Sequence, residues 1–489
     1  MPTPFTSKFI HLLQTFDEAE LKAFERWLQS PWCNTNKNLT RLLTRLKPYY
    51  PGFSDTKLTK EKLFRQVLPD GKFSERRMNN LLSEAYLAAE KFLVFQRFSG
   101  EHHLQKELLI QEFQGRGLDD WFFRDARREI DRLESREVKD WKDHLGLLRL
   151  HRRMYHHPGK GPGGQAGHAT IVQMGAQIDL LYLLEKAAVI NEMIFQNRLF
   201  KEEPHDLPAE LKKWFTAAGG IRHPALELYR MRFADAGEEN LLPQFLQLQT
   251  AFLERFDALN TREQNIHLLS LLNDAKQLIK AGALDITKSL PLYQLGLTTG
   301  AVLNQGKMTS NTYLTIVTAS NTKRTFDFTG QFTDTYTVCL AEEVRDDCAR
   351  WAGAHTAYWR NGPEACLAIL QGYEFSAPNL QLTGRVLAAQ AHFDLYLKDA
   401  SYQSYLFHYF DTFEKWLNRD KIWSKSNMTT FLRFVQISRT LAKYYTDPDP
   451  NPKNLENLLD QEQNIQALNW LKLKREEVLR LKAKRPSRI

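Results

Sequence analysis

The amino-acid sequence predicts an all-α protein, an irregular array of antiparallel helix pairs preceded by an N-terminal helical domain. Two observations support this fold class. Apolar residues recur at spacings of three and four, which place them along one face of a helix. Gly, Pro and Asn interrupt these stripes, and a single helix pair could not bury its own stripe without stacked neighbours.

The clearest helix pair is predicted between residues 346 and 372. Its first helix carries an apolar and aromatic stripe formed by Trp351, Ala354, His355 and Tyr358. The tripeptide Asn361-Gly362-Pro363 then ends this helix, because Gly favours the conformation of helix ends and Pro suits the first turn of a new helix. A second helix is therefore expected to begin at Glu364.

A second pair is predicted to repeat this pattern between residues 380 and 416. The turn between its helices is Lys398-Asp399-Ala400-Ser401. The first helix carries Leu380, Val386, Leu387, Ala391, Phe393, Leu395 and Leu397, and the second carries Tyr405, Leu406, Tyr409, Phe410, Phe413 and Trp416. Two tandem pairs predict that the chain is built by stacking such units.

The segment Trp351…Ala354…Tyr358…Gly362…Ala365 resembles the first half of a tetratricopeptide repeat, with a short deletion after the glycine. The resemblance covers one unit, since the period of roughly 34 residues is not maintained and the usual final proline is missing. It implies a tetratricopeptide-like α-solenoid, a fold whose members generally bind other proteins. A helical array without repeat ancestry is the alternative.

Length and composition predict a folded protein. The chain has 489 residues, of which 43% are hydrophobic and 25% charged. It contains no apolar run of about eighteen residues, so no membrane insertion is expected. The N-terminus lacks the zones of a secretion signal, and the four cysteines are sparse, which predicts a cytoplasmic protein with reduced thiols at Cys33, Cys339, Cys348 and Cys366.

Three regions are expected. Residues 1–99 form the N-terminal helical domain, residues 100–450 the helical array, and residues 451–489 capping helices and a basic tail. The array includes a Gly- and Pro-rich segment at 158–168, which predicts a flexible linker because it matches no phosphate-binding loop. Residues 310–336 are rich in Thr, Val, Ile and Phe, which favours strand locally, but the helical surroundings predict helices here too.

The array contains no recognisable catalytic or metal-binding motif. His-Glu-x-x-His, Gly-x-Ser-x-Gly, Walker and dinucleotide patterns do not occur, so no catalytic residue, cofactor, metal ligand or small-molecule substrate is predicted. Asp140, His144 and His151 share one predicted helix face. The two histidines are about 10 Å apart along the helix axis, which is too far for one ion. They are expected to be surface residues.

Basic residues suggest a possible nucleic-acid contact in two places. A short helix, a turn and a longer helix that is capped by Ser74 and begins with Arg76 and Arg77 could read DNA, although the turn is longer than usual and the region has no strong basic excess. The C-terminal end concentrates positive charge at Lys472, Lys474, Arg475, Arg480, Lys482, Lys484, Arg485 and Arg488. This end predicts either an anionic contact or a solvated terminus.

We therefore expect a non-enzymatic adaptor that binds an unidentified protein or peptide on its helical surface. The candidate anchors are Trp351, His355, Tyr358, Trp359 and Arg360, because aromatic residues and Arg commonly anchor interfaces. Trp351 and Tyr358 suit a core equally well, so Trp359 and Arg360 carry more of the prediction. One alternative is a nucleic-acid-associated protein that uses the basic tail, with or without the Arg76–Arg77 segment. Another is an enzyme whose site has no recognisable motif.

Overall fold

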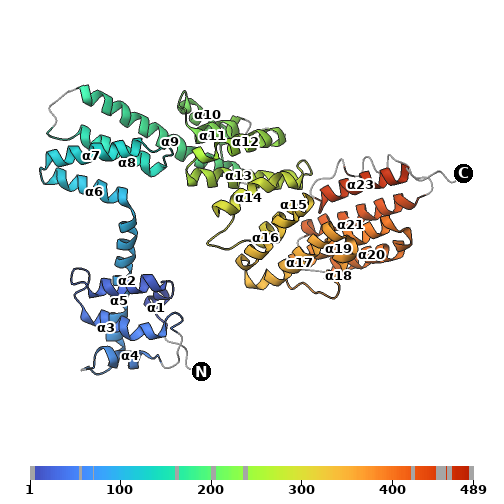
Figure 1. Ribbon diagram of the computed structural model, residues 1–489, viewed down its shortest axis with the longest axis horizontal. Helices are drawn as coiled ribbons and strands as arrows, with labels where there is room; N and C mark the ends of the chain where they lie inside the picture. Colours follow the sequence, from blue (N-terminus) through green and yellow to red (C-terminus); the bar gives the residue numbers. More distant parts are fainter. Residues whose placement is uncertain are drawn as a thin grey trace. The chain divides into compact units, whose positions relative to one another are not determined.

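The computed structural model describes residues 6–53, 58–69, 71–159, 165–199, 205–234, 241–419, 425–447, 459 and 465–483. Within these ranges the chain folds into α-helices joined by turns and short 3-10 helices, and it forms no strand (Figure 1). The all-α prediction is therefore confirmed. Residues 160–164 of the loop expected at 158–168 lie outside the described residues, as do most of residues 448–464 and the end of the basic tail. The prediction of a loop is wrong for residues 165–168, because a helix already begins at Gln165.

The chain divides into two compact units. The first comprises residues 1–136 and 142–177, and the second comprises residues 137–141 and 178–489. None of the helices in the described ranges combines the length and the apolar character that a membrane-spanning helix needs.

The first unit begins with five helices packed around one aromatic core. They are α1 (Lys8–Leu13), α2 (Glu18–Gln29), α3 (Lys37–Leu46), α4 (Lys60–Val67) and α5 (Glu75–Gly100). Phe24 lies at the centre of this core, 5.3 Å from Phe92 and 5.8 Å from Phe16 between ring centroids. The predicted cap at Ser74 is confirmed, because its hydroxyl accepts from the backbone N–H of Arg77.

The remaining helices of this unit are α6 (His102–Gly115), α7 (Asp119–Glu134), α8 (Trp141–Tyr155) and the beginning of α9 (Gln165–Leu199). The expectation of surface histidines on α8 is wrong, since His144 and His151 are only 3% and 7% exposed. His144 Nδ1 lies 2.8 Å from Gln177 Oε1 on α9, a partner that the α8 sequence could not reveal.

The second unit continues with α10 (Leu207–Ala218), α11 (Pro224–Ala234), α12 (Leu241–Arg255), α13 (Thr261–Lys280) and α14 (Leu290–Thr299). Next come α15 (Ser310–Thr322) and α16 (Phe326–Tyr336), which confirm the prediction of helices in residues 310–336. A large apolar core runs through these elements and into α17 to α19.

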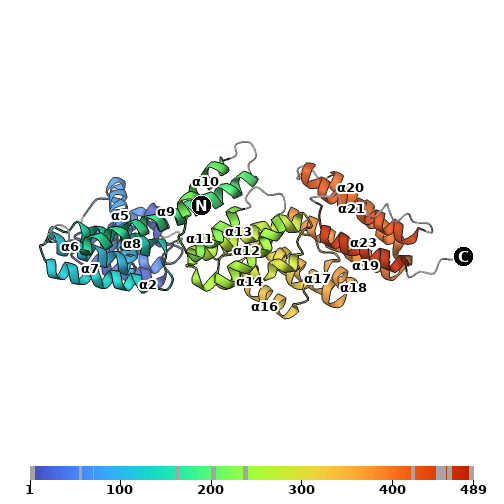
Figure 2. The ribbon, with the colours of Figure 1, turned by 90° about the horizontal axis from the view of Figure 1, so that it is seen from above.

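The predicted helix pairs are present as α17 (Glu342–Asn361) with α18 (Pro363–Leu370), and α19 (Pro378–Lys398) with α20 (Gln403–Arg419). Gly362 separates the first pair with φ at 103°, a conformation that favours glycine. From α17 to α21 (Lys425–Thr446) each helix packs on the next, and α21 packs on α23 (Leu468–Ala483) (Figure 2).

The short 3-10 helices are η1 (Lys47–Tyr49), η2 (Phe256–Ala258), η3 (Ile286–Ser289), η4 (Thr337–Cys339) and η5 (Ala400–Tyr402).

Candidate functional site

A cleft with a volume of about 440 Å³ lies beside α17 in the second unit, and we call it the α17 cleft. It brings together three of the five residues that the sequence predicted as partner anchors. Its lining includes His355, Tyr358 and Trp359 of α17, Lys276 and Lys280 of α13, Thr315 and Thr318 of α15, and Trp470 of α23. These elements are distant in the sequence, so only their packing creates the cleft.

His355 is positioned by a buried hydrogen-bond relay. Asn321 Nδ2 lies 3.0 Å from His355 Nδ1 and also donates to Thr356 Oγ1, while Asn321 Oδ1 accepts from the hydroxyl of Thr329. Because Nδ1 accepts, the ring proton is placed on Nε2. Burial lowers the pKa of His355 to about 3, so the imidazole is neutral and offers the cleft an N–H donor.

The other predicted anchors occupy different environments. Trp351 is buried behind the imidazole of His355, with ring centroids 4.7 Å apart. The core alternative for Trp351 and Tyr358 is therefore confirmed, and the predicted anchor His355 is buried with them, because α17 turns all three toward the core. Trp359 is half-buried at the cleft, whereas Arg360 is exposed, and its guanidinium lies 6.0 Å from the ring centroid of Phe326.

Tyr358 belongs to a polar network that ties α17 to α19 and α23. Its hydroxyl donates to Asp394 Oδ2 and accepts from the indole N–H of Trp470, over 2.5 Å and 3.1 Å. Lys474 Nζ lies 2.7 Å from the other oxygen of Asp394. Burial raises the pKa of Tyr358 well above its ordinary value, so the hydroxyl remains a donor.

The basic residues of α23 are largely engaged inside the second unit. Besides the ion pair of Lys474, Lys472 Nζ donates to the carbonyl of Gly282 over 2.9 Å, and Lys482 Nζ donates to the carbonyl of Tyr445. Arg480 is exposed and Arg475 is half-buried. Lys484 and Arg485 lie outside the described residues.

Arg76 and Arg77, the other candidates for a nucleic-acid contact, lie at the exposed start of α5 in the first unit. The guanidinium of Arg77 is 5.6 Å from the ring centroid of Phe64 on α4. This contact joins the two helices of the predicted DNA-reading segment, and the first turn of α5 leaves the arginines accessible.

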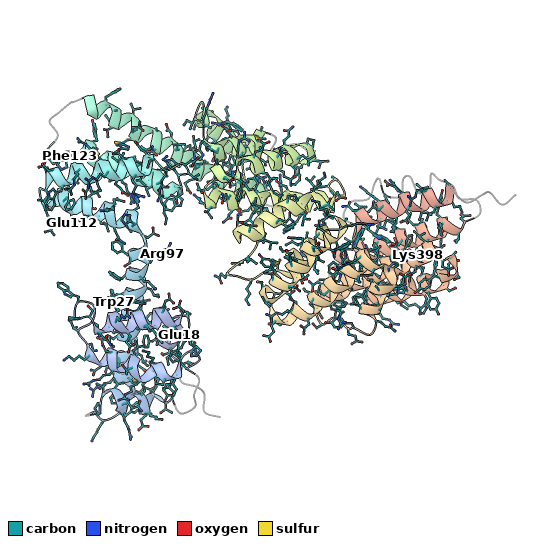
Figure 3. The ribbon with its side chains drawn as sticks, in the orientation of Figure 1. Glu18, Trp27, Arg97, Glu112, Phe123 and Lys398 are labelled. Carbon is teal, nitrogen blue, oxygen red and sulfur yellow. The ribbon has the colours of Figure 1, made fainter. Side chains whose placement is uncertain are left out.

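A second and larger hollow, of about 900 Å³, lies between α18, α19 and α20, and we call it the tyrosine groove. Sequence reasoning did not identify it. Its lining includes Tyr373, Arg385, His392, Tyr402, Tyr405, Tyr409 and Trp416. Glu364, which also lines the groove, forms an ion pair of 3.2 Å with Lys398, the residue labelled in Figure 3.

The rings of the tyrosine groove form a continuous series. Tyr405 stacks on Tyr402 with centroids 5.2 Å apart, Tyr402 stacks on His392 at 5.8 Å, and His392 contacts Tyr409 at 4.7 Å. Tyr405 is 69% exposed. Farther along, the guanidinium of Arg385 lies 4.5 Å from the ring centroid of Trp416.

The sequence feature that could have indicated this groove is the recurrence of tyrosine and tryptophan on α20. Tyr405, Tyr409 and Trp416 recur at helical spacing, which predicted a core stripe. However, these side chains carry polar groups that a fully apolar core would leave unsatisfied. In the structure Tyr409 donates to the carbonyl of Arg385 over 3.0 Å while its ring lines the groove.

Within the described ranges, no group of three or more His, Cys, Asp or Glu side chains is arranged to hold a metal ion. No family model matches the chain, and neither a curated protein nor a solved structure is significantly similar to it.

Proposed function

We propose that the protein is a non-enzymatic adaptor, and that its tyrosine groove binds an extended, proline-rich segment of a partner protein. The observation that carries the proposal is the series of partly accessible rings from Tyr405 through His392 to Tyr409. Grooves lined by aromatic rings suit polyproline II segments, which present flat pyrrolidine faces and lose little conformational entropy on binding.

Donors in the groove suit the backbone of such a ligand. A polyproline II segment has no internal hydrogen bonds, so its carbonyl groups need donors from the surface that binds it. Arg385 lies over Trp416, and among the described residues its guanidinium has no carboxylate partner. The hydroxyl of Tyr405 lies on an exposed side chain and offers a further donor.

The carboxylates at the groove favour a basic residue beside the prolines. Glu364 is paired with Lys398, whereas Glu374 is exposed and forms no ion pair with any residue in the described ranges. A Lys or Arg beside the prolines of the bound segment could form an ion pair with the carboxylate of Glu374. Such a contact at the rim adds selectivity and a faster association rate more than affinity.

The proposal is tested by fluorescence polarisation of the full chain with a labelled oligoproline peptide that carries an arginine at each end. We expect saturable binding, weakened about tenfold or more by Tyr405→Ala and by Arg385→Gln. Tyr182→Ala is the matched control, because Tyr182 is 45% exposed and lies outside the groove. This variant should bind as the unmodified chain does.

Three outcomes would contradict the proposal. The first is no binding of the oligoproline peptide, and the second is binding that neither groove variant weakens. The third is stronger binding of an acidic peptide of equal length, which would assign Arg385 to carboxylate recognition. Circular dichroism of each variant establishes that a lost affinity does not reflect lost helices.

A further inference from the structure

We infer that the α17 cleft is a binding site for a small planar organic anion of the aromatic carboxylate class. This inference does not rest on the tyrosine groove, since the two hollows are lined by different residues. The volume of about 440 Å³ is within the range of small-molecule pockets, which extends from roughly 300 to 1,000 Å³.

His355 provides a donor for the bound molecule. Its side chain lines the cleft although the residue is only 5% exposed, and Nδ1 is occupied by Asn321. Within the described ranges, Nε2 has no hydrogen-bond partner. Because the His355 side chain lines the cleft, a ligand oxygen can accept a hydrogen bond from Nε2 there.

Two lysines give the cleft its positive charge. Lys276 and Lys280 follow one another by one turn of α13, and neither has a carboxylate partner in the part of the chain that the structure describes. Desolvation lowers the pKa of Lys276. Among the described residues that line the same cleft, only Asp285 is acidic, so one positive charge remains uncompensated there and favours a monoanion.

The cleft also presents aromatic surface. Trp359 is half-buried at its wall, and Trp470 and Tyr358 line it from α23 and α17. Flat aromatic side chains of this kind favour a ligand with a planar apolar ring system. The carboxylate of such a ligand would then contact Lys276 and His355. The threonine side chains of α15 complete a wall that mixes methyl and hydroxyl groups.

The experiment is isothermal titration calorimetry of the full chain with a series of matched probes. Benzoate, 1-naphthoate and indole-3-acetate are compared with 1-naphthalenemethanol, which is uncharged, and with 1-naphthylmethylammonium, which is cationic. We expect at least one carboxylate to bind about tenfold more tightly than either naphthalene analogue. Lys276→Met should weaken that binding about tenfold, whereas Lys323→Met, an exposed lysine outside the cleft, should not.

Protection from chemical modification tests the same site without a variant that could misfold. The bound carboxylate should slow acetylation of Lys276 by acetic anhydride, followed by mass spectrometry, while the acetylation of Lys323 stays unchanged. The inference is overturned if no carboxylate binds, or if the uncharged probe binds as well as the anions. It is also overturned if binding leaves the acetylation of Lys276 unaffected.

Discussion

Asn321 and His355 meet in the interior of the second unit, where the amide nitrogen of Asn321 lies 3.0 Å from Nδ1 of the imidazole. This contact links α15 to α17 and selects the tautomer that directs an N–H into the α17 cleft. Asn321 also binds the hydroxyls of Thr356 and Thr329, so one fully buried amide serves three partners.

Replacing Asn321 by leucine should therefore be strongly destabilising. Asn321→Leu leaves the polar groups of His355, Thr356 and Thr329 without this partner. We expect the free energy of unfolding to fall by about 2–4 kcal/mol, because buried unsatisfied groups are costly. The check is the midpoint of urea unfolding followed by tryptophan fluorescence. Asn418→Leu, at an exposed position of α20, is the control, and equal midpoints for the two variants would contradict the role of the relay.

Acid should weaken the fold through two buried histidines. Burial lowers the pKa of both His267 and His355 from 6.5 to about 3. Between these values the unfolded chain binds protons that the folded chain does not bind, so stability falls as the pH drops below 6.5. Each histidine should cost about 2 kcal/mol between pH 6.5 and pH 5.

Urea unfolding at several pH values measures this effect. His355→Gln should reduce the dependence of stability on pH by about one proton, since it removes one imidazole that stays neutral in the folded chain. His408→Gln removes an exposed histidine and should leave the dependence unchanged. If stability does not change between pH 6.5 and pH 5, the neutral buried state of these residues is refuted.

Lys474 and Arg480 lie on the same helix and should respond differently to substitution. Lys474→Met leaves the carboxylate of Asp394, which is 16% exposed, without its cation, and should cost about 3 kcal/mol. Arg480→Gln changes an exposed residue and should alter stability by less than about 0.5 kcal/mol. Thermal melting compares the two. A larger loss for Arg480→Gln would contradict the structural role assigned to Lys474.

The four cysteines should separate into two reactivity classes. Burial raises the pKa of Cys348 and Cys366 to about 12, so their thiols are protonated as well as enclosed at pH 8. Cys33 and Cys339 are half-buried. Iodoacetamide at pH 8 should modify Cys33 and Cys339 first, and the other two only in urea, as mass spectrometry of digested protein would reveal. Early modification of Cys366 would count against its burial in the native state.

Much of the secondary structure was predictable because its causes are local. The Asn361-Gly362-Pro363 stop separates α17 from α18, and the Ser74 cap begins α5, as the sequence indicated. Each of these signals acts within about one helical turn, where the chain itself fixes the distances. The helices at 310–336 could be predicted only from the helical character of the surrounding segments, because the residue types alone favour strands there.

The candidate sites were predictable only in part. His355, Tyr358 and Trp359 were predicted from the sequence as partner anchors on one helix, and these three residues do line one cleft. Their neighbours in that cleft come from α13, α15, α19 and α23, whose approach depends on packing between distant segments. The tyrosine groove was missed because helical spacing alone does not distinguish a buried ring from one that lines a hollow.

The helical character of the chain and many helix ends follow from the order of its residues, because periodicity, caps and breakers are short-range properties. Which polar side chains form internal hydrogen bonds depends on the packing of distant segments. Lys472, which lies in a basic run, donates to the carbonyl of Gly282, 190 positions away. A polar side chain is buried and paired by residues that packing brings close to it. These residues are distant in the sequence, so a local sequence pattern does not identify them.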